Sequence, residues 1–356
     1  MKTIAIIIND LKGNGAERVM ITLADELISQ GHQCHIVCFK SVHELPSRNM
    51  LTTHVFPMKY WRWIPRKWRA KLLTQILDRF ITRCIGSVPD LVLSNLLPAD
   101  RIMSGSHLPN THLIVHNTIS KEFTDSSSNG KPSDIDQVIN IYKKKPVICV
   151  SQGVLLDLKR LLPDHTQVRH IYNPVDVDFI QSSANKPNPI DFSSPYLIHV
   201  GKFKSAKRHD RLIRAYAQSN SPLKLVLVGQ GPLMQQTESL VQALNIKHRV
   251  IFAGFHANPY PIIAGATAMV LSSDYEGLAM VILEALVLDV PVISTDCPSG
   301  PGEILPKNNL VATDNETELA KKIYDVSTTP DLFKITMPEK FTSQVITRQY
   351  LGLINE

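Results

Sequence analysis

Short apolar runs alternate with longer amphipathic segments along almost the whole chain. In the first half, the apolar runs predict buried strands at residues 3–9, 34–39, 91–95, 112–117 and 146–150. Between the first two runs, residues 15–31 are patterned as a helix that ends at a glycine. Strands that alternate with helices form a parallel sheet covered on both faces. The pattern therefore predicts an α/β domain.

The same alternation restarts after a change in composition. Asn, Ser and Pro are concentrated in residues 171–195, which indicates a linker. Beyond it, apolar runs predict strands at 196–203, 223–229, 249–254, 267–273 and 291–295. We therefore expect two doubly wound, Rossmann-like domains, residues 1–174 and 175–337, and a C-terminal helix at about 338–356 that packs back on the first. In two such domains that face each other, a ligand binds in the cleft at the carboxyl ends of the strands.

The composition limits the class of protein and its partners. Apolar residues make up 44% and charged residues 20% of the chain, which excludes wholesale disorder. The net charge of +6 favours an anionic partner, namely nucleic acid, a membrane surface or a phosphorylated small molecule. No run approaches the roughly 18 apolar residues that span a bilayer, so we expect any membrane contact to be peripheral.

The cysteines and the first residues indicate the compartment. The chain has 5 cysteines and no CxxC pair, a usage typical of reduced thiols in the cytosol. The opening MKTIAIIIND has neither a useful apolar stretch nor a cleavage site for a signal peptide, and is predicted to be a strand. We therefore expect a cytoplasmic protein.

The segment SSDYEGLAMVILEAL combines carboxylates with a helix start. A strand ends at Ser273, a loop carries Glu276 and Gly277, and a helix that contains Glu284 begins near Ala279. The first turn of a helix offers free N–H groups and a positive dipole end to a diphosphate. A carboxylate accepts hydrogen bonds from two sugar hydroxyls. The alternative is a surface-loop glutamate followed by a solvated helix glutamate.

The segment VGKFKSAKRHDRLIRAYA places cations beside another strand end. Lys202 and Lys207 lie between the predicted strand and an amphipathic helix, where they suit a diphosphate whose charge grows as it leaves. Arg208 is a candidate to share this role. The alternative is a solvated basic entry to the helix.

Two further strand ends carry candidate residues. Gly13 and Gly15 lie between the first strand and its helix, so their N–H groups can face a phosphate or a sugar. A packed strand–helix turn is the alternative there. His116 ends the strand in LIVHNTIS, where it is either structural or a hydrogen-bonding group that assists proton movement.

These motifs together resemble a known family. The spacing of Glu276 and Glu284 in EGLAMVILEAL is similar to the signature of the retaining GT-B glycosyltransferases of family 4. GNGAERV resembles the GGAERV opening of that family, with Asn14 in place of the first glycine. DCPSGPGEIL resembles a segment of members that add hexosamine or hexose units to bacterial glycolipids, with Gly302 where arginine is common. Lys207 matches the family, whereas Lys202 replaces its usual arginine.

The resemblance implies a reaction and its residues. A sugar would move from a UDP-sugar to a saccharide acceptor on a lipid, in lipooligosaccharide, O-antigen or undecaprenyl-diphosphate glycan synthesis, with retention of configuration. The implied catalytic residues are His116, Glu276 and Lys207. The first Glu would hold the transferred sugar and the second the ribose, while the backbone near Phe255 would contact the base. The implied donor-binding residues are Gly13, Gly15, Lys202, Lys207, Phe255, Glu276, Gly277, Leu278, Ala279 and Glu284.

Other reactions and roles stay open at this point. No DxD-like pair follows a predicted strand and no Cys/His cluster has zinc spacing, so we expect neither a metal nor a cofactor. A UDP-sugar epimerase of the same fold is one alternative. A nucleotide-sugar-binding scaffold protein is another.

The segment YWRWIPRKWR, residues 60–69, holds all 3 tryptophans of the chain. Its basic residues, and one just beyond it, are Arg62, Arg66, Lys67, Arg69 and Lys71. An amphipathic helix follows, with Leu73, Leu77, Phe80 and Cys84 in one stripe.

Tryptophan and basic residues before an amphipathic helix favour the interface of an anionic membrane. They equally suit the phosphates of a lipid-linked acceptor. The alternative is a helix packed on its own sheet, with its tryptophans in the core. Nucleic acid is disfavoured because no recognition motif accompanies the basic residues. We expect a peripheral protein on the inner face of the cytoplasmic membrane.

Overall fold

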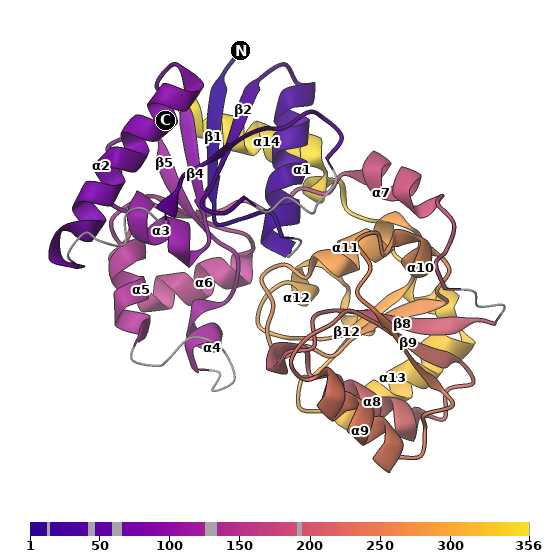
Figure 1. Cartoon of the computed structure of the whole chain (residues 1–356). Helices are drawn as coiled ribbons and strands as arrows, with labels where there is room; N and C mark the ends of the chain where they lie inside the picture. The colour runs from indigo at the N-terminus through magenta and orange to yellow at the C-terminus, as the bar shows by residue number, and fades with distance from the viewer. Residues whose placement is uncertain (13–14, 42–46, 59–65, 125–133, 191–193, 356) are drawn as a thin grey trace. The chain divides into compact units, whose positions relative to one another are not determined.

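The computed structural model describes residues 1–356 except 13–14, 42–46, 59–65, 125–133, 191–193 and 356. The chain divides into two compact units (Figure 1). The N-terminal unit comprises Met1–Phe123, Gly130–Val175 and Glu339–Glu356. The C-terminal unit consists mainly of Asp176–Pro338.

The N-terminal unit is built on a 7-stranded parallel sheet of order β3-β2-β1-β4-β5-β6-β7. Its strands are β1 (Thr3–Ile8), β2 (Gln33–Cys38), β3 (Thr52–Val55), β4 (Leu91–Asn95), β5 (Thr111–Val115), β6 (Val147–Cys149) and β7 (Val168–His170). The central strands are buried on both faces, which is why they are continuous apolar runs in the sequence.

The outer strands β3 and β7 differ from the prediction, which contained neither. Both lie at the edges of the sheet. The side chains of β3 are exposed or half-buried, and only Val168 of β7 is fully buried. These two edge strands therefore lack the apolar run that identifies a central one.

The helices of the N-terminal unit include one from the far end of the chain. They are α1 (Gly15–Ser29), α2 (Arg66–Ile85), α3 (Leu97–Met103), α4 (Ile119–Thr124), α5 (Ile135–Tyr142), α6 (Gln152–Leu161) and α14 (Ser343–Gly352). Helix α14 packs against α1, where the Ser343 hydroxyl donates to Glu26 Oε2 at 2.8 Å. The last helix thus completes the first unit.

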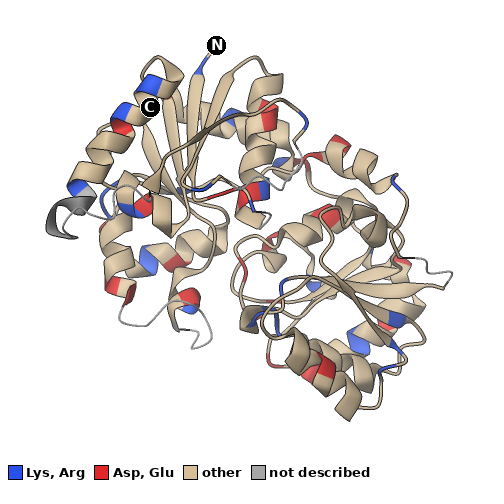
Figure 2. Ribbon diagram, viewed as in Figure 1, with Lys and Arg blue, Asp and Glu red and all other residues tan. Residues whose placement is uncertain are grey.

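Helix α2 has a buried apolar side and an exposed basic side. Leu73 and Leu77 are 4% and 0% exposed, so they belong to the core of the unit and are not available to lipid. The interfacial interpretation was wrong for these two leucines, because they are buried in the N-terminal unit, where α2 packs against α3. Basic residues recur along α2 (Figure 2), and Lys71, Arg79 and Arg83 are exposed.

The aromatic and basic stretch at residues 60–69 is only partly described. Arg62 lies outside the described residues. Arg66, Lys67 and Arg69 are helical, but their side chains lie outside the description. No helix in the described ranges has the length and apolar character to cross a bilayer.

The C-terminal unit has a 6-stranded parallel sheet of order β10-β9-β8-β11-β12-β13. Its strands are β8 (Tyr196–Val200), β9 (Lys224–Val228), β10 (Val250–Gly254), β11 (Ala268–Leu271), β12 (Val292–Thr295) and β13 (Leu310–Val311). Its helices are α7 (Val177–Ala184), α8 (His209–Ser219), α9 (Met234–Ala243), α10 (Tyr260–Ala264), α11 (Met280–Val287), α12 (Pro301–Ile304) and α13 (Glu316–Thr328). In Figure 1, α8, α9 and α13 lie on one side of the sheet, and α10 and α11 on the other.

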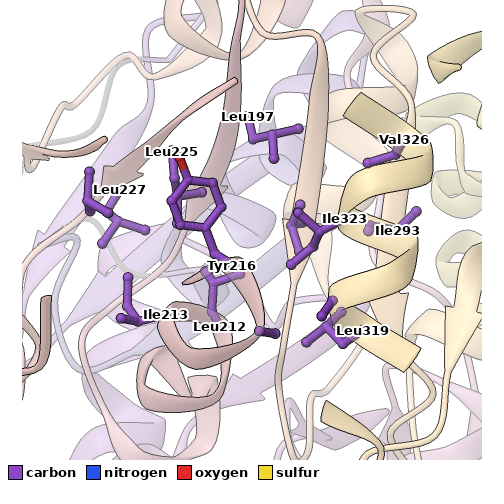
Figure 3. Close-up of a cluster of buried hydrophobic side chains, with 14 of the residues drawn as sticks. Leu197, Leu212, Ile213, Tyr216, Leu225, Leu227, Ile293, Leu319, Ile323 and Val326 are labelled. Carbon is purple, nitrogen blue, oxygen red and sulfur yellow. The ribbon is translucent and has the colours of Figure 1, made fainter. Parts of the chain in front are cut away.

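A hydrophobic cluster fixes α8 and α13 to this sheet (Figure 3). Tyr216 of α8 is fully buried among leucines of β8 and β9, and its hydroxyl donates to Leu223 O at 2.7 Å. Leu319 and Ile323 of α13 complete the cluster at 0% exposure. Each buried side chain of this size contributes about 2 kcal/mol to stability. The cluster therefore holds α8 against the sheet.

The segment predicted as a linker contains helix α7. Asp176 caps it, because its Oδ1 accepts a hydrogen bond from Phe179 N at 3.0 Å. Asn258 Nδ2 donates to Ser183 O at 2.9 Å and ties α7 to the segment that leads into α10. The polar composition obscured this helix, since the same residue types favour both caps and linkers.

Candidate active site

Lys207 and Glu276 meet at the carboxyl ends of β8 and β11. Lys207 Nζ lies 2.6 Å from Glu276 Oε1, and the hydroxyl of Ser273 donates to the same oxygen at 2.6 Å. The two charged side chains are only 15% and 9% exposed. Residues 69 positions apart are therefore joined in a nearly buried ion pair.

The carboxyl group of Glu276 is ionised at neutral pH. Burial raises its pKa, but the charge and hydrogen bond of Lys207, together with the Ser273 hydroxyl, outweigh burial, and the pKa lies below its usual value. An ionised carboxylate accepts hydrogen bonds and donates none. The site thus presents an acceptor for hydroxyl groups beside a cation for a phosphate.

The segment after β12 supports the loop that carries Glu276. The hydroxyl of Thr295 donates to Ser273 O at 2.6 Å, and that of Ser299 donates to Glu276 O at 2.6 Å. Gly300 has a φ of 94°, and a Cβ there would lie 2.9 Å from the carbonyl carbon of Leu278. Only glycine allows this close approach, so the segment after β12 holds the loop in place.

Gly302, which stands where the family commonly has arginine, lies close to an acidic side chain. A Cβ at this position would lie 2.8 Å from Asp296 Oδ1. Asp296 is exposed, so its side chain has room to move away from a larger residue at position 302.

Two arginines clamp the residue that precedes the loop. Arg208 Nη1 donates to Asp274 Oδ2 at 2.9 Å, and Arg211 Nη2 donates to Asp274 Oδ1 at 2.6 Å. Arg208 also pairs with Asp210 at 2.9 Å. Its guanidinium is thus bound by carboxylates. That Arg208 also shares the binding of a phosphate stays a prediction, since Lys207, the other cation of this motif, is likewise paired with a carboxylate.

Asp274→Asn is expected to lower the free energy of unfolding by about 2 kcal/mol. The reason is that it weakens the charged hydrogen bond to Arg211, whose side chain is only 9% exposed. Urea unfolding monitored by circular dichroism measures the change. Asp331→Asn is the matched control, since its pair with Lys334 is 57% and 83% exposed and contributes little. If the two substitutions lower the free energy of unfolding equally, the pairing of Asp274 with the two arginines is no more stabilising than an exposed ion pair.

Helix α11 begins beside the ion pair without a side-chain cap. Ala279 at its start has a φ of 57°, a left-handed conformation that is costly for a residue with a Cβ. Glu284 lies one turn along and is 7% exposed, with Tyr260 Oη at 3.4 Å from its Oε1. Glu276 is 8% exposed. Neither glutamate is solvated, so the alternative of two surface carboxylates was wrong.

The remaining candidates in this unit lie around the same strand ends. Gly277 and Leu278 are buried in the loop. Lys202, two residues after the end of β8, is exposed, and Phe255, directly after β10, is 49% exposed. Sequence reasoning missed Gly229, at which a Cβ would lie 2.1 Å from Gly201 O. The signal was a glycine directly after a buried strand.

In the N-terminal unit, His116 lies at the carboxyl end of β5. Its Nε2 is 2.9 Å from Asn95 Oδ1, at the end of the adjacent strand β4. Burial lowers the pKa of His116 to about 4, so the imidazole is neutral at pH 7. Gly13 lies outside the described residues. Gly15 starts α1, and a Cβ there would meet nothing within 4 Å, so its small size is not needed for packing.

The described residues contain no metal-binding cluster, and most of the cysteines are buried. No group of three or more His, Cys, Asp or Glu side chains in this part of the chain is arranged to hold an ion. The cysteines are free, and Cys34, Cys38, Cys149 and Cys297 are buried. Burial raises the pKa of Cys34 to about 12, which keeps it a thiol.

Comparison with known families accounts for both units. The family model described as Glycosyl transferases group 1 matches residues 181–343, and that described as Glycosyltransferase Family 4 matches residues 13–179. The chain belongs to glycosyltransferase family 4. It is a glycosyltransferase, and the predicted resemblance is confirmed.

Relatives of this glycosyltransferase act on bacterial glycans. It is 27% identical over 335 residues to the N-acetylgalactosamine-N,N'-diacetylbacillosaminyl-diphospho-undecaprenol 4-alpha-N-acetylgalactosaminyltransferase of Campylobacter jejuni, covering 90% of this chain and 88% of that one. It is 29% identical over 164 residues to the lipopolysaccharide 1,6-galactosyltransferase of Escherichia coli, covering 44% and 45%. The crystal structure of Anabaena HepE with UDP and glucose superposes with a TM-score of 0.77, 17% identity and 100% coverage of both chains. The fold is GT-B, as predicted.

Proposed function

We propose that this glycosyltransferase moves a sugar from a UDP-sugar to a saccharide on a lipid carrier, with retention of configuration and without a metal. The pairing of Lys207 with Glu276 carries the proposal. It places a cation for the diphosphate 2.6 Å from an ionised acceptor for sugar hydroxyls. A sugar diphosphate carries the matching groups next to each other, since its hydroxyls complement Glu276 and its diphosphate complements Lys207.

The printed names of the relatives support the choice of donor and acceptor. The Campylobacter jejuni enzyme is named for a diphospho-undecaprenol substrate and the Escherichia coli enzyme for lipopolysaccharide. The Anabaena structure contains UDP and glucose. The charge of this chain, +6, suits substrates that carry phosphates.

The chemistry assigns a role to each group. The bond between the anomeric carbon and the diphosphate oxygen breaks, and its electron pair leaves with UDP. Lys207 and Lys202 neutralise the growing negative charge, helped by the uncapped N–H groups at the start of α11. Glu276 holds the sugar by its hydroxyls, and Glu284 holds the ribose. The acceptor hydroxyl attacks the face that UDP leaves and passes its proton to the departing diphosphate oxygen, so the charges balance and configuration is retained.

Helix α2 supplies a surface for an anionic membrane. Its exposed side carries Lys71, Arg79 and Arg83, each of which attracts anionic lipid by about 1 kcal/mol. Arg66, Lys67 and Arg69 at the start of α2, and Arg62 before it, add to the basic residues of this stretch of chain. The enzyme would then meet its lipid-borne acceptor at the membrane surface.

Nucleotide release tests the proposal. The purified protein is incubated with UDP-, GDP- and ADP-sugars, each with and without a membrane glycolipid extract. We expect UDP release from a UDP-sugar, and a higher rate when the extract is present. Release of no nucleotide from any donor contradicts the transfer. A rate that does not respond to the extract contradicts the lipid-borne acceptor.

A further inference from the structure

The side chain that faces His116 is a fully buried amide. Asn95 ends β4, is 0% exposed, and presents Oδ1 to His116 Nε2 at 2.9 Å. The two residues lie at the carboxyl ends of adjacent parallel strands. A buried polar pair of this kind has fixed donors and acceptors, which the neighbouring backbone determines.

Backbone carbonyls set the orientation of the Asn95 amide. Its Nδ2 donates to Leu93 O at 3.0 Å and lies 3.5 Å from Ile7 O. Carbonyl oxygens only accept hydrogen bonds, so the NH₂ group must point at them. The amide oxygen is consequently the atom that faces His116.

The amide oxygen in turn determines the tautomer of His116. An oxygen acceptor requires that Nε2 carry the hydrogen. A neutral imidazole has a single N–H, and burial keeps this ring neutral by lowering its pKa to about 4. Nδ1 is then left with a lone pair. It has no hydrogen-bond partner among the residues that the structure describes.

We propose that Asn95 is a positioning residue that holds His116 as the Nε2–H tautomer, so that Nδ1 accepts a hydrogen bond from a substrate hydroxyl. A phosphate oxygen at neutral pH has no hydrogen to donate and is disfavoured at this nitrogen. His116 therefore selects a sugar hydroxyl over the diphosphate. The substrate part of this inference rests on the proposed function, whereas the tautomer does not.

Long-range ¹H–¹⁵N correlation spectra of the imidazole test the tautomer directly. In the unaltered protein we expect a protonated Nε2 and a bare Nδ1 for His116. Asn95→Leu removes the acceptor and should give the Nδ1–H form or a mixture of both forms. Asn95→Asp keeps an oxygen opposite Nε2 and should keep that nitrogen protonated. Nδ1–H in the unaltered protein, or an unchanged tautomer in Asn95→Leu, overturns the proposal.

A matched control separates positioning from stability. Ser94 precedes Asn95 in β4, is also 0% exposed, and donates to Asp100 Oδ1 at 2.7 Å. Ser94→Ala removes a buried hydrogen bond from the same strand and should leave the His116 tautomer unchanged. A changed tautomer in this control means that any damage to β4 disturbs the ring, and would overturn the role of Asn95.

Transfer kinetics complete the test. Asn95→Leu is expected to lower kcat/KM about ten-fold, the value of one well-placed hydrogen bond, while Ser94→Ala stays near the unaltered value. Unchanged kcat/KM in Asn95→Leu contradicts positioning even if the tautomer shifts. If no donor supports transfer, the proposed function fails, and the spectra still decide the tautomer.

Discussion

Glu276→Gln is expected to lower kcat/KM for sugar transfer by about 100- to 1,000-fold. The carboxylate faces Lys207 at 2.6 Å and is held by the Ser273 hydroxyl on the same oxygen. Glutamine keeps the shape but loses the charge and one of the two acceptor oxygens. The loss of a charge-assisted contact at a reacting sugar has this magnitude in other enzymes.

Steady-state release of UDP with saturating acceptor measures the effect. Glu238→Gln is the control, a half-buried glutamate on α9 of the same unit, away from the ion pair. Its rate should be unchanged. Circular dichroism and the Tm establish that both variants are folded. Unimpaired transfer by Glu276→Gln would show that this carboxylate does not hold the donor.

Acidification is expected to destabilise the C-terminal unit from pH 6.5 downward, through two buried histidines. His199 and His209 are 0% and 3% exposed, with ring centroids 4.7 Å apart. Burial lowers the pKa of His199 to about 4 and that of His209 to about 2, from 6.5. Below pH 6.5 the unfolded chain binds protons that the folded chain does not, so stability falls with pH. By pH 5 each contributes a loss of about 2 kcal/mol.

His209→Phe isolates this effect. The ring stacks on Phe203 with centroids 4.0 Å apart, and neither of its nitrogens has a hydrogen-bond partner in the described structure. Phenylalanine fits the same stack without buried polar atoms, so the variant should be more stable at pH 5 by about 2 kcal/mol. Urea unfolding at pH 7 and pH 5 measures the difference. The exposed His248, changed to Gln, should leave the pH dependence intact. An equal fall in stability for His209→Phe would contradict the assignment.

The sequence was most informative where both faces of an element are buried. The central strands of each sheet were predicted because most positions in them are apolar, as in β1, where only Thr3 is polar, and in β11, where all four are apolar. Edge strands β3, β7 and β13 were missed because half of each strand is exposed or the pairing is short. Helix α7 was missed because its capping aspartate lies in a polar stretch that equally describes a linker.

In the candidate site, the sequence identified the charged residues but not the hydroxyl groups that hydrogen-bond to them and to their loop. The spacing of Glu276 and Glu284 predicted two carboxylates near one helix start, and both are buried there. The hydroxyls of Ser273 and Ser299 gave no signal, because serine is common and its partners are distant in sequence. The pairing of Arg208 with Asp274 was not predicted for the same physical reason, because the two residues lie 66 positions apart and only the fold brings them together.

The return of α14 to the N-terminal unit sets the order in which the units are completed. Glu26 of α1 is bonded to Ser343, 317 residues further along, and Ile346 and Tyr350 of α14 are 0% exposed. During translation, the whole C-terminal unit is therefore synthesised before the N-terminal unit acquires its last helix. A fragment cut at the boundary after Val175 would leave the α1 surface uncovered. The N-terminal unit is compact, but it contains segments from both ends of the chain, so no single continuous fragment holds all of it.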